Sequence, residues 1–157
     1  MMVKLVPMNE LEFEMYVQYS IQEYAQEQEK SGRESEDEGV HEAEQQYQQL
    51  LPQGLQTPNH TLCMIVDEER DKSVGVLWFD QHAQENERQV NINDIVIFEE
   101  FRRRGYAKRA IQLLEKQAIE LGATSVVLRT LEPNESMRIL YERLKHMVAS
   151  MSMSKSL

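Results

Sequence analysis

The spacing of apolar residues along the chain predicts a series of short strands and amphipathic helices. Apolar runs and alternations predict six strands, at residues 3–6, 61–66, 73–80, 90–97, 125–130 and 147–153. Apolar residues at helical spacing predict four helices, at residues 11–29, 41–51, 105–121 and 134–144. A strand-helix-strand unit lies in the middle of this order, and antiparallel strands precede it. We therefore expect an α/β fold, with a mixed sheet of six to seven strands and helices on both of its faces.

Polar segments mark the expected connections between these elements. Residues 30–39 contain no apolar side chain and are predicted as a loop, as are the polar residues 81–89. Gly122 follows the last apolar position of the third helix and is predicted to end it in a left-handed conformation. The chain has no internal repeat, and its 157 residues are a usual size for one domain. We therefore expect a single domain over residues 1–157.

The junction between the strand at 90–97 and the helix that follows carries the most informative residues. Residues 102–107 read Arg-Arg-Arg-Gly-Tyr-Ala. A glycine at the start of a helix lets a ligand approach the backbone, because it has no Cβ. The first amides of a helix lack intrahelical partners and carry the positive end of its dipole. Beside three arginines, these amides predict an anion site, most naturally for phosphate.

The composition is that of a globular protein in water, with 41% hydrophobic and 28% charged residues. No apolar run approaches the roughly 20 residues of a membrane-spanning helix. The N-terminal Met-Met-Val-Lys-Leu-Val-Pro is too short and too soon interrupted for a signal peptide. We therefore expect a cytoplasmic protein that does not bind membranes.

The formal net charge of −10 is unevenly distributed along the chain. Residues 1–60 hold 12 acidic and 3 basic residues, whereas residues 61–157 hold 15 acidic and 14 basic residues. A negative field of this kind disfavours nucleic acid and favours a cationic substrate. The alternative is a pair of helices whose carboxylates are simply solvated.

The cysteine and histidine residues suggest neither disulfide nor metal chemistry. The single cysteine, Cys63, lies in the apolar run Thr-Leu-Cys-Met-Ile-Val, which predicts a buried strand residue. The four histidines are scattered, and none has a second His or Cys at metal-ligand spacing. We therefore expect no metal.

The junction at residues 102–107 resembles motif A of the GNAT superfamily of N-acetyltransferases. That motif, Arg/Gln-x-x-Gly-x-Gly/Ala after an apolar strand, falls on Arg102, Gly105 and Ala107. Residues 134–144, Asn-Glu-Ser-Met-Arg-Ile-Leu-Tyr-Glu-Arg-Leu, resemble the family's Asn-x-x-Ala-x-x-Leu-Tyr-x-x-x-Gly-Phe segment. The order of strands and helices also matches, and the helical N-terminal third resembles small GNAT proteins of Gram-positive bacteria.

Three positions depart from the second family segment. Lys145 and His146 stand where the family has Gly-Phe, and Met137 stands where a small residue is usual. A lysine in the positive-φ position of that glycine costs about 1 kcal/mol. These changes affect the C-terminal end of the expected site and leave the pyrophosphate loop untouched.

The resemblance implies acetyl-coenzyme A as donor and a primary amine as acceptor, which attacks directly in a ternary complex. The pyrophosphate is expected on the backbone amides of residues 103–107, and the pantetheine arm along the edge of the central strand. The expected coenzyme-binding residues are Ile95, Val96, Ile97, Arg102, Arg103, Arg104, Gly105, Tyr106, Ala107 and Asn134.

The resemblance also implies the catalytic residues. Tyr141 matches the family's general acid, whose alternative is a packed helix tyrosine, and an amide near Val96 would stabilise the oxyanion. Asp94 is a candidate base or ammonium ligand, and its alternative is a strand-end carboxylate bonded to backbone amides. Asn93 is predicted to face the opposite side of the strand from Asp94.

Other interpretations stay open at the level of sequence. Trp78 and Tyr47 either line an acceptor pocket or only pack against other side chains in the core or at the surface. The fold could hold acyl-coenzyme A as a sensor without turnover, which the change at Lys145-His146 suggests. A nucleic-acid adaptor using the arginines is a third class, which we do not expect. Exposed edge strands make a homodimer reasonable.

Overall fold

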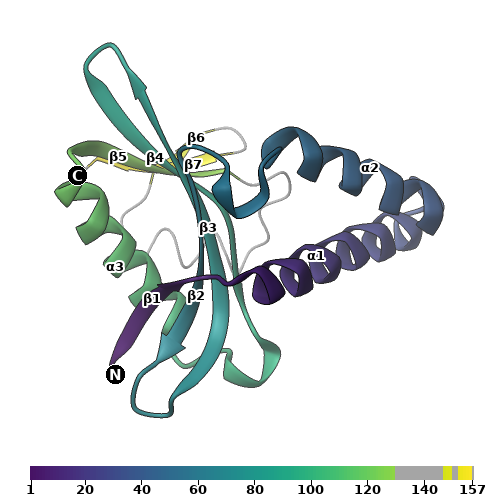
Figure 1. Ribbon diagram of the computed structural model, residues 1–157, viewed down its shortest axis with the longest axis horizontal. Helices are drawn as coiled ribbons and strands as arrows, with labels where there is room; N and C mark the ends of the chain where they lie inside the picture. The colour runs from purple at the N-terminus through teal and green to yellow at the C-terminus, as the bar shows by residue number, and fades with distance from the viewer. Residues whose placement is uncertain (130–146, 150–151, 157) are drawn as a thin grey trace. The chain divides into compact units, whose positions relative to one another are not determined.

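The computed structural model describes residues 1–129, 147–149 and 152–156 (Figure 1). Within these residues the chain forms two compact units, Met8–His60 and the remainder, Met1–Pro7 with Thr61–Leu157. The predicted helix at 134–144 lies outside the described residues. Each unit has its own internal packing, and we describe them in turn.

The larger unit is built on a sheet of seven strands among the described residues, in the order β1-β2-β3-β4-β5-β7-β6. Its strands β4 and β5 are parallel, whereas β1–β2, β3–β4, β5–β7 and β6–β7 are antiparallel. The mixed α/β sheet predicted from the sequence is therefore confirmed. The elements are β1 (Val3–Pro7), β2 (His60–Asp67), β3 (Lys72–Gln84), β4 (Glu87–Ile97), η2 (Glu99–Phe101), α3 (Tyr106–Glu120), β5 (Ala123–Arg129), β6 (Met147–Ala149) and β7 (Ser152–Ser156).

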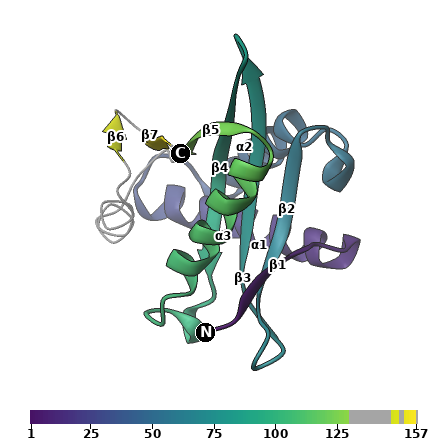
Figure 2. The same ribbon diagram turned by 90° about the vertical axis from the view of Figure 1, so that its left-hand side faces the viewer.

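One face of this sheet packs on α3 (Figure 2). The buried side of α3 consists of Tyr106, Ala110, Ile111, Leu114 and Ala118, at helical spacing. They meet apolar side chains of the strands, among them Ile65, Leu77, Phe79, Val90, Ile92 and Val126. The helix ends at Glu120 with Leu121 as its C-cap, and Gly122 adopts the predicted left-handed φ of +84°.

Cys63 is buried in β2, as its apolar surroundings predict, and burial raises the pKa of its thiol to about 11.

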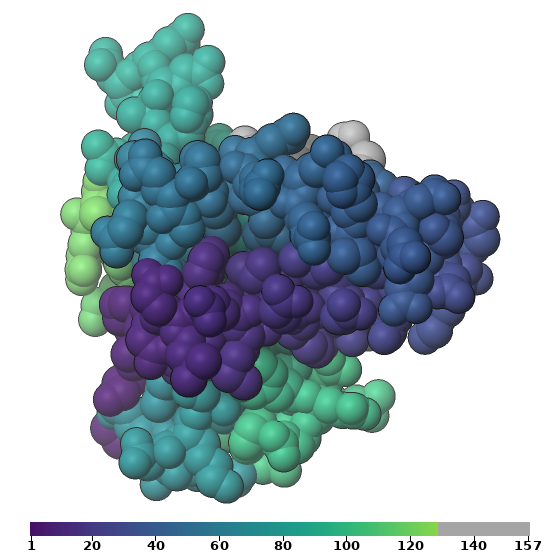
Figure 3. Space-filling view, turned by 45° about the vertical axis from the view of Figure 1, so that its right-hand side comes forward, coloured from purple at the N-terminus to yellow at the C-terminus, as the bar shows by residue number. Residues whose placement is uncertain are grey.

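The smaller unit is a helical hairpin, in which α1 (Glu10–Lys30) and α2 (Glu36–Leu50) lie side by side, followed by η1 (Gly54–Gln56) (Figures 1 and 3). The side chain of Asn9 accepts from the amide of Glu12, and the Glu12 carboxylate accepts from the amide of Asn9. Ser35 caps α2 by accepting from the Glu38 amide at 3.3 Å. None of the helices among the described residues is long and apolar enough to cross a membrane.

Three predicted boundaries differ from the structure. The predicted loop at 30–39 is too long, because α2 already begins at Glu36. Residues 81–89 are mostly strand rather than loop, since β3 and β4 continue to a tight turn at Glu85-Asn86. The single final strand at 147–153 is wrong, because β6 and β7 are two strands that pair with each other.

Candidate active site: the open edge of β4 and the start of α3

Among the described residues, the central strand β4 pairs with its parallel neighbour β5 along only about half of its length. Its pairing with β5 ends at Ile92 and Leu128, although β4 continues to Ile97. On its other side β4 stays paired with β3 up to Ile97, which lies opposite Gly75. Residues 93–97 therefore have one open edge among the described parts of the chain, which accommodates an added extended segment.

Hydrogen-bond direction decides which residues of β4 present their backbone at this open edge. The Phe98 amide donates to the Val74 carbonyl of β3 at 2.9 Å. Successive residues of a strand direct their backbone groups to opposite sides, so Ile97 and Ile95 point away from β3. The Val96 carbonyl faces β3, where a Cβ on Gly75 would collide with it. Ile95 and Ile97, rather than Val96, therefore offer backbone groups at the open edge.

A β-bulge changes which side chains of β4 share a face. Trp78 pairs with Asp94 but Phe79 pairs with Ile92, so Asn93 is an extra residue. Ile92 packs in the core with α3, and Ile95 packs against the same core. Asn93 and Asp94 therefore both lie on the opposite face, and the prediction that they face different sides is wrong.

Polar side chains gather on this second face of β3 and β4. Both oxygens of the Asp80 carboxylate accept hydrogen bonds of 2.8 Å, one from Asn91 and one from Asn93. Gln89 donates to the side chain of Asn91 at 2.6 Å, and Asn91 is only 1% exposed. This network fixes the strand on the N-terminal side of Asp94. The alternation Val-Asn-Ile-Asn-Asp in β4 was its sequence signal, but the sequence alone did not reveal Asp80 as the shared partner.

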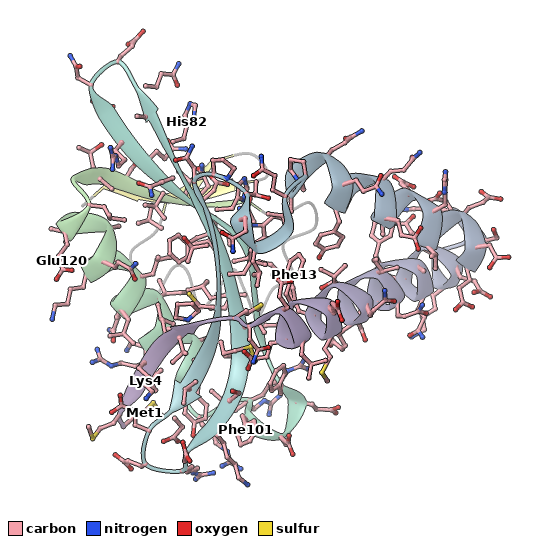
Figure 4. The ribbon with its side chains drawn as sticks, in the orientation of Figure 1. Met1, Lys4, Phe13, His82, Phe101 and Glu120 are labelled. Atoms are coloured by element: carbon pink, nitrogen blue, oxygen red, sulfur yellow. The ribbon has the colours of Figure 1, made fainter. Side chains whose placement is uncertain are left out.

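Past Ile97 the chain turns through η2 and enters α3 at Gly105. Gly105 is the N-cap of α3, with φ +87° and no side-chain capping hydrogen bond. A Cβ at Gly105 would meet only the end of the Met1 side chain, at 3.9 Å. Met1 and Phe101 both lie at this end of the unit (Figure 4). The first amides of α3 thus lie beside open space at the positive end of the helix, which suits an anion.

The three arginines at the junction have different surroundings. The Nε of Arg102 donates to the carbonyl oxygen of Ile97 at 2.9 Å, so this side chain braces the end of β4. Arg103 adopts a left-handed φ of +62°, and both Arg103 and Arg104 are exposed. Arg103 and Arg104 are therefore better placed than Arg102 to add charge for a phosphate group.

Tyr106, predicted to bind the coenzyme, directs its side chain into the core. The residue is 3% exposed, and its ring packs edge-to-face against Phe101. Its hydroxyl donates to the Asp67 carboxylate at 2.5 Å. Only the backbone amide of Tyr106 is left for an anion, and its side chain anchors the start of α3 to β2.

The Tyr106–Asp67 contact shifts both pKa values. The hydroxyl of Tyr106 lowers the pKa of Asp67, assisted by the backbone amides of Arg70 and Glu69 and opposed by burial. The Asp67 carboxylate, together with burial, raises the pKa of Tyr106. Asp67 directly follows the apolar run of β2 in the sequence, and that position gave no signal of this bond.

The remaining predicted residues are divided between the two units and the undescribed segment. Asp94 is half-buried, opposite the buried Trp78 in β3. Tyr47 belongs to α2 and packs edge-to-face on Tyr16 of α1, with ring centroids 6.5 Å apart. Tyr141 and Asn134 lie outside the described residues, as do the departures at 137 and 145–146.

Comparison with known proteins identifies the family of this arrangement. The Acetyltransferase (GNAT) family matches residues 16–146, which include both halves of the junction described above. The chain belongs to the GNAT family of acetyltransferases. The resemblance noted in its sequence is confirmed, and the protein is a GNAT-type acyltransferase.

Relatives of this GNAT chain match it over nearly its whole length. The N-acetyltransferase YycN of Bacillus subtilis is 32% identical, with 100% of both chains covered. A crystal structure of YycN has a TM-score of 0.84, with 99% of each chain covered. The B. subtilis N-acetyltransferase YdgE is 30% identical, and the match covers 98% of this chain and 97% of the YdgE chain. The PaiA N-acetyltransferase of Thermoplasma acidophilum, solved in complex with coenzyme A, is 12% identical with a TM-score of 0.70 and full coverage of both chains, a likeness of fold.

Proposed function

We propose that this protein transfers the acetyl group of acetyl-coenzyme A to a primary amine, by direct attack in a ternary complex. One observation carries the proposal: the open edge of β4 leads, through the short η2, to the start of α3, which has no side-chain cap. An extended arm and an anionic group are the two chemical parts that this arrangement accommodates. Further support comes from YycN and YdgE, which are named as uncharacterized N-acetyltransferases, and from PaiA, whose similar fold was solved with coenzyme A.

The residues at the junction would hold the donor in complementary ways. Ile95 offers its backbone amide and carbonyl to the pantetheine arm, and Ile97 offers its amide, because the Ile97 carbonyl already accepts from Arg102. The amides of residues 103–107 bind the pyrophosphate, and Arg103 and Arg104 add charge. Arg102 keeps the end of β4 in place through its bond to Ile97. A strand amide at the open edge stabilises the charge that develops on the thioester oxygen, a role that Ile95 suits better than Val96.

The proton transfers need two further groups. Asp94 is our candidate base, taking a proton from the amine through a water or holding the ammonium form; its alternative role is a backbone-bonded strand carboxylate. Tyr141, by its match to the family motif, is our candidate acid for the departing thiolate. A positioned acid or base contributes roughly 10²–10⁴-fold to the rate.

The acceptor that we propose is cationic: a small polyamine-like molecule, a protein lysine or an N-terminal amine. The support is the charge of residues 8–60, which hold 12 acidic and 2 basic residues, whereas the rest of the chain holds 15 of each. A negative field raises the local concentration of a cation. We expect no nucleic acid as a partner, for the same reason.

We also propose that residues 1–157 act as one GNAT domain, with no metal. Among the described strands, β1 and β6 are the outermost of the sheet, and the outer edge of a sheet is a surface on which a second copy could pair to form a homodimer.

An amine panel tests the proposed function. With acetyl-coenzyme A, thiol release is expected with cationic amines. Release with only neutral or acidic amines would contradict the cationic acceptor.

A second candidate, an acyl-coenzyme A sensor, is favoured by Lys145-His146 in place of Gly-Phe. It gains if coenzyme A raises the melting temperature while no amine is acetylated. Tyr141→Phe tests the acid, since an unchanged rate would exclude that role.

A further inference from the structure

The helical hairpin contains a pocket of its own. Its volume is about 350 Å³, and every residue that lines it belongs to Met8–His60. That volume is at the lower end of the range for small-molecule sites. The lining residues are Phe13, Glu14, Val17, Gln18, Ile21, Glu44, Tyr47, Gln48, Leu51 and Gly54.

Packing within the hairpin explains why the pocket lies where it does. Near the connecting loop the two helices are in close contact. A Cβ on Gly39 of α2 would lie only 2.9 Å from the Cα of Ala25 in α1, so the glycine permits this approach. Towards the other end, large side chains separate them, among them the edge-to-face pair Tyr16 and Tyr47. Phe13 rises from α1 (Figure 4) and closes one wall, where a Cβ on Gly54 would lie 3.3 Å from its ring.

The lining combines apolar, aromatic and anionic groups. Ile21 and Leu51 are buried, and Val17 is half-buried, so the floor is aliphatic. The carboxylates of Glu14 and Glu44 stand at exposed positions, one on each helix. None of the lining residues is basic, and the hairpin as a whole holds 12 acidic against 2 basic residues.

We propose that this pocket binds an aliphatic amine in its ammonium form. The carboxylates of Glu14 and Glu44 attract the ammonium group, and the face of the Tyr47 ring adds a cation–π contact. The aliphatic chain of the ligand lies on Val17 and Leu51, where it leaves water. The proposal extends the cationic acceptor proposed above to a named set of residues, and rests on it only for the class of ligand.

Calorimetric titration with 1,6-diaminohexane, without acetyl-coenzyme A, tests the binding directly. We expect 1,6-diaminohexane to bind and the neutral 1,6-hexanediol to bind at least about tenfold more weakly. The double variant E14Q/E44Q should weaken diamine binding at least about tenfold. The control Glu23→Gln removes a charge from an exposed position of α1 outside the pocket, and should change binding less than about twofold.

Three results would overturn the proposal: no diamine binding to the wild-type protein, equal binding of the diol, or equal losses in E14Q/E44Q and E23Q. Circular dichroism of each variant establishes that its helices are intact.

Adding acetyl-coenzyme A shows whether the bound amine is the acceptor of the acetyl group or an effector of the enzyme. Acetylation of the diamine that is lost in E14Q/E44Q identifies an acceptor; binding that instead alters the acetylation of another amine identifies an effector. Binding without acetylation of any amine contradicts the proposed function and leaves the pocket intact. Acetylation of other amines without diamine binding contradicts the pocket alone.

Discussion

At the scale of single residues, the bond between Tyr106 and Asp67 fixes the position of the α3 N-terminus. It joins the first residue of α3 to the last residue of β2 across 39 positions of the sequence. The bond needs a charged Asp67 and a neutral Tyr106. Because the folded pKa of Asp67 is lowered, its contribution to stability is present above about pH 4 and is lost as pH falls further.

Tyr106→Phe should therefore lower the melting temperature by a few degrees near neutral pH. The difference from wild type should shrink as pH falls below about 4, where Asp67 takes up a proton in both proteins. Because the folded pKa of Tyr106 is raised, the difference should also shrink above about pH 10. Thermal melts across this range give the measurement, and a pH-independent difference would contradict the account.

Variants of Gly105 and Arg103 distinguish the contribution of the backbone amides to coenzyme A binding from that of side-chain charge. Gly105→Ala places a Cβ in open space beside the α3 amides, at a φ that costs about 1–2 kcal/mol. We expect coenzyme A binding to weaken about tenfold or more, and Arg103→Ala to weaken it less. The control Gly32→Ala has a similar φ of +71° and open surroundings in the hairpin. Calorimetric titration with coenzyme A measures the affinity of each variant. A larger loss of affinity from Arg103→Ala than from Gly105→Ala would show that side-chain charge matters more than the backbone amides.

At the scale of elements, Gly75 controls how closely β3 and β4 approach at the open edge. The Val96 carbonyl occupies the place where a Cβ of residue 75 would lie. Gly75→Ala should displace β4 and destabilise the fold by about 1–3 kcal/mol.

The same variant should weaken coenzyme A binding, because it shifts the backbone of Ile95 and Ile97. Gly122→Ala is the matched control: its φ of +84° gives a similar loss of stability, but no atom lies within 4 Å of the new Cβ. Urea melts with coenzyme A titrations compare the two. Equal affinities would show that the edge of β4 does not hold the donor.

Elements of this fold could be predicted from the sequence where neighbouring residues determine them. The junction at Gly105 was predicted, because a glycine before helical spacing is a local signal. The start of α2 also had a local signal, in Ser35 followed by three acidic residues, but the absence of apolar residues concealed it. The turn at Glu85-Asn86 has positive φ at both residues without a glycine, so residues 81–89 read as a loop.

The face of Asn93 could not be predicted from its own strand. The bulge arises from pairing with β3, a tertiary contact, and one extra residue reverses the alternation after it. In the same way, Tyr106 stands at a position that the family motif leaves unspecified, and its partner Asp67 lies in a distant strand.

At the scale of the whole molecule, the net negative charge of the chain comes from one unit. Residues 8–60 carry a formal charge of −10, and the rest of the chain is neutral. Like charges along two adjacent helices repel each other, and salt screens exposed charges. Raising NaCl from about 50 mM to about 500 mM should therefore raise the melting temperature. A decrease in thermal melts would show that attractive ion pairs outweigh this repulsion.

The central claim is that the open edge of β4 and the start of α3 together hold the acetyl donor. Amide signals followed by NMR during a titration with coenzyme A test it most directly. We expect the largest shifts at residues 103–107 and at Ile95 and Ile97, with small shifts in Glu10–Leu50. Shifts confined to the helical hairpin, with the α3 amides unmoved, would contradict the account.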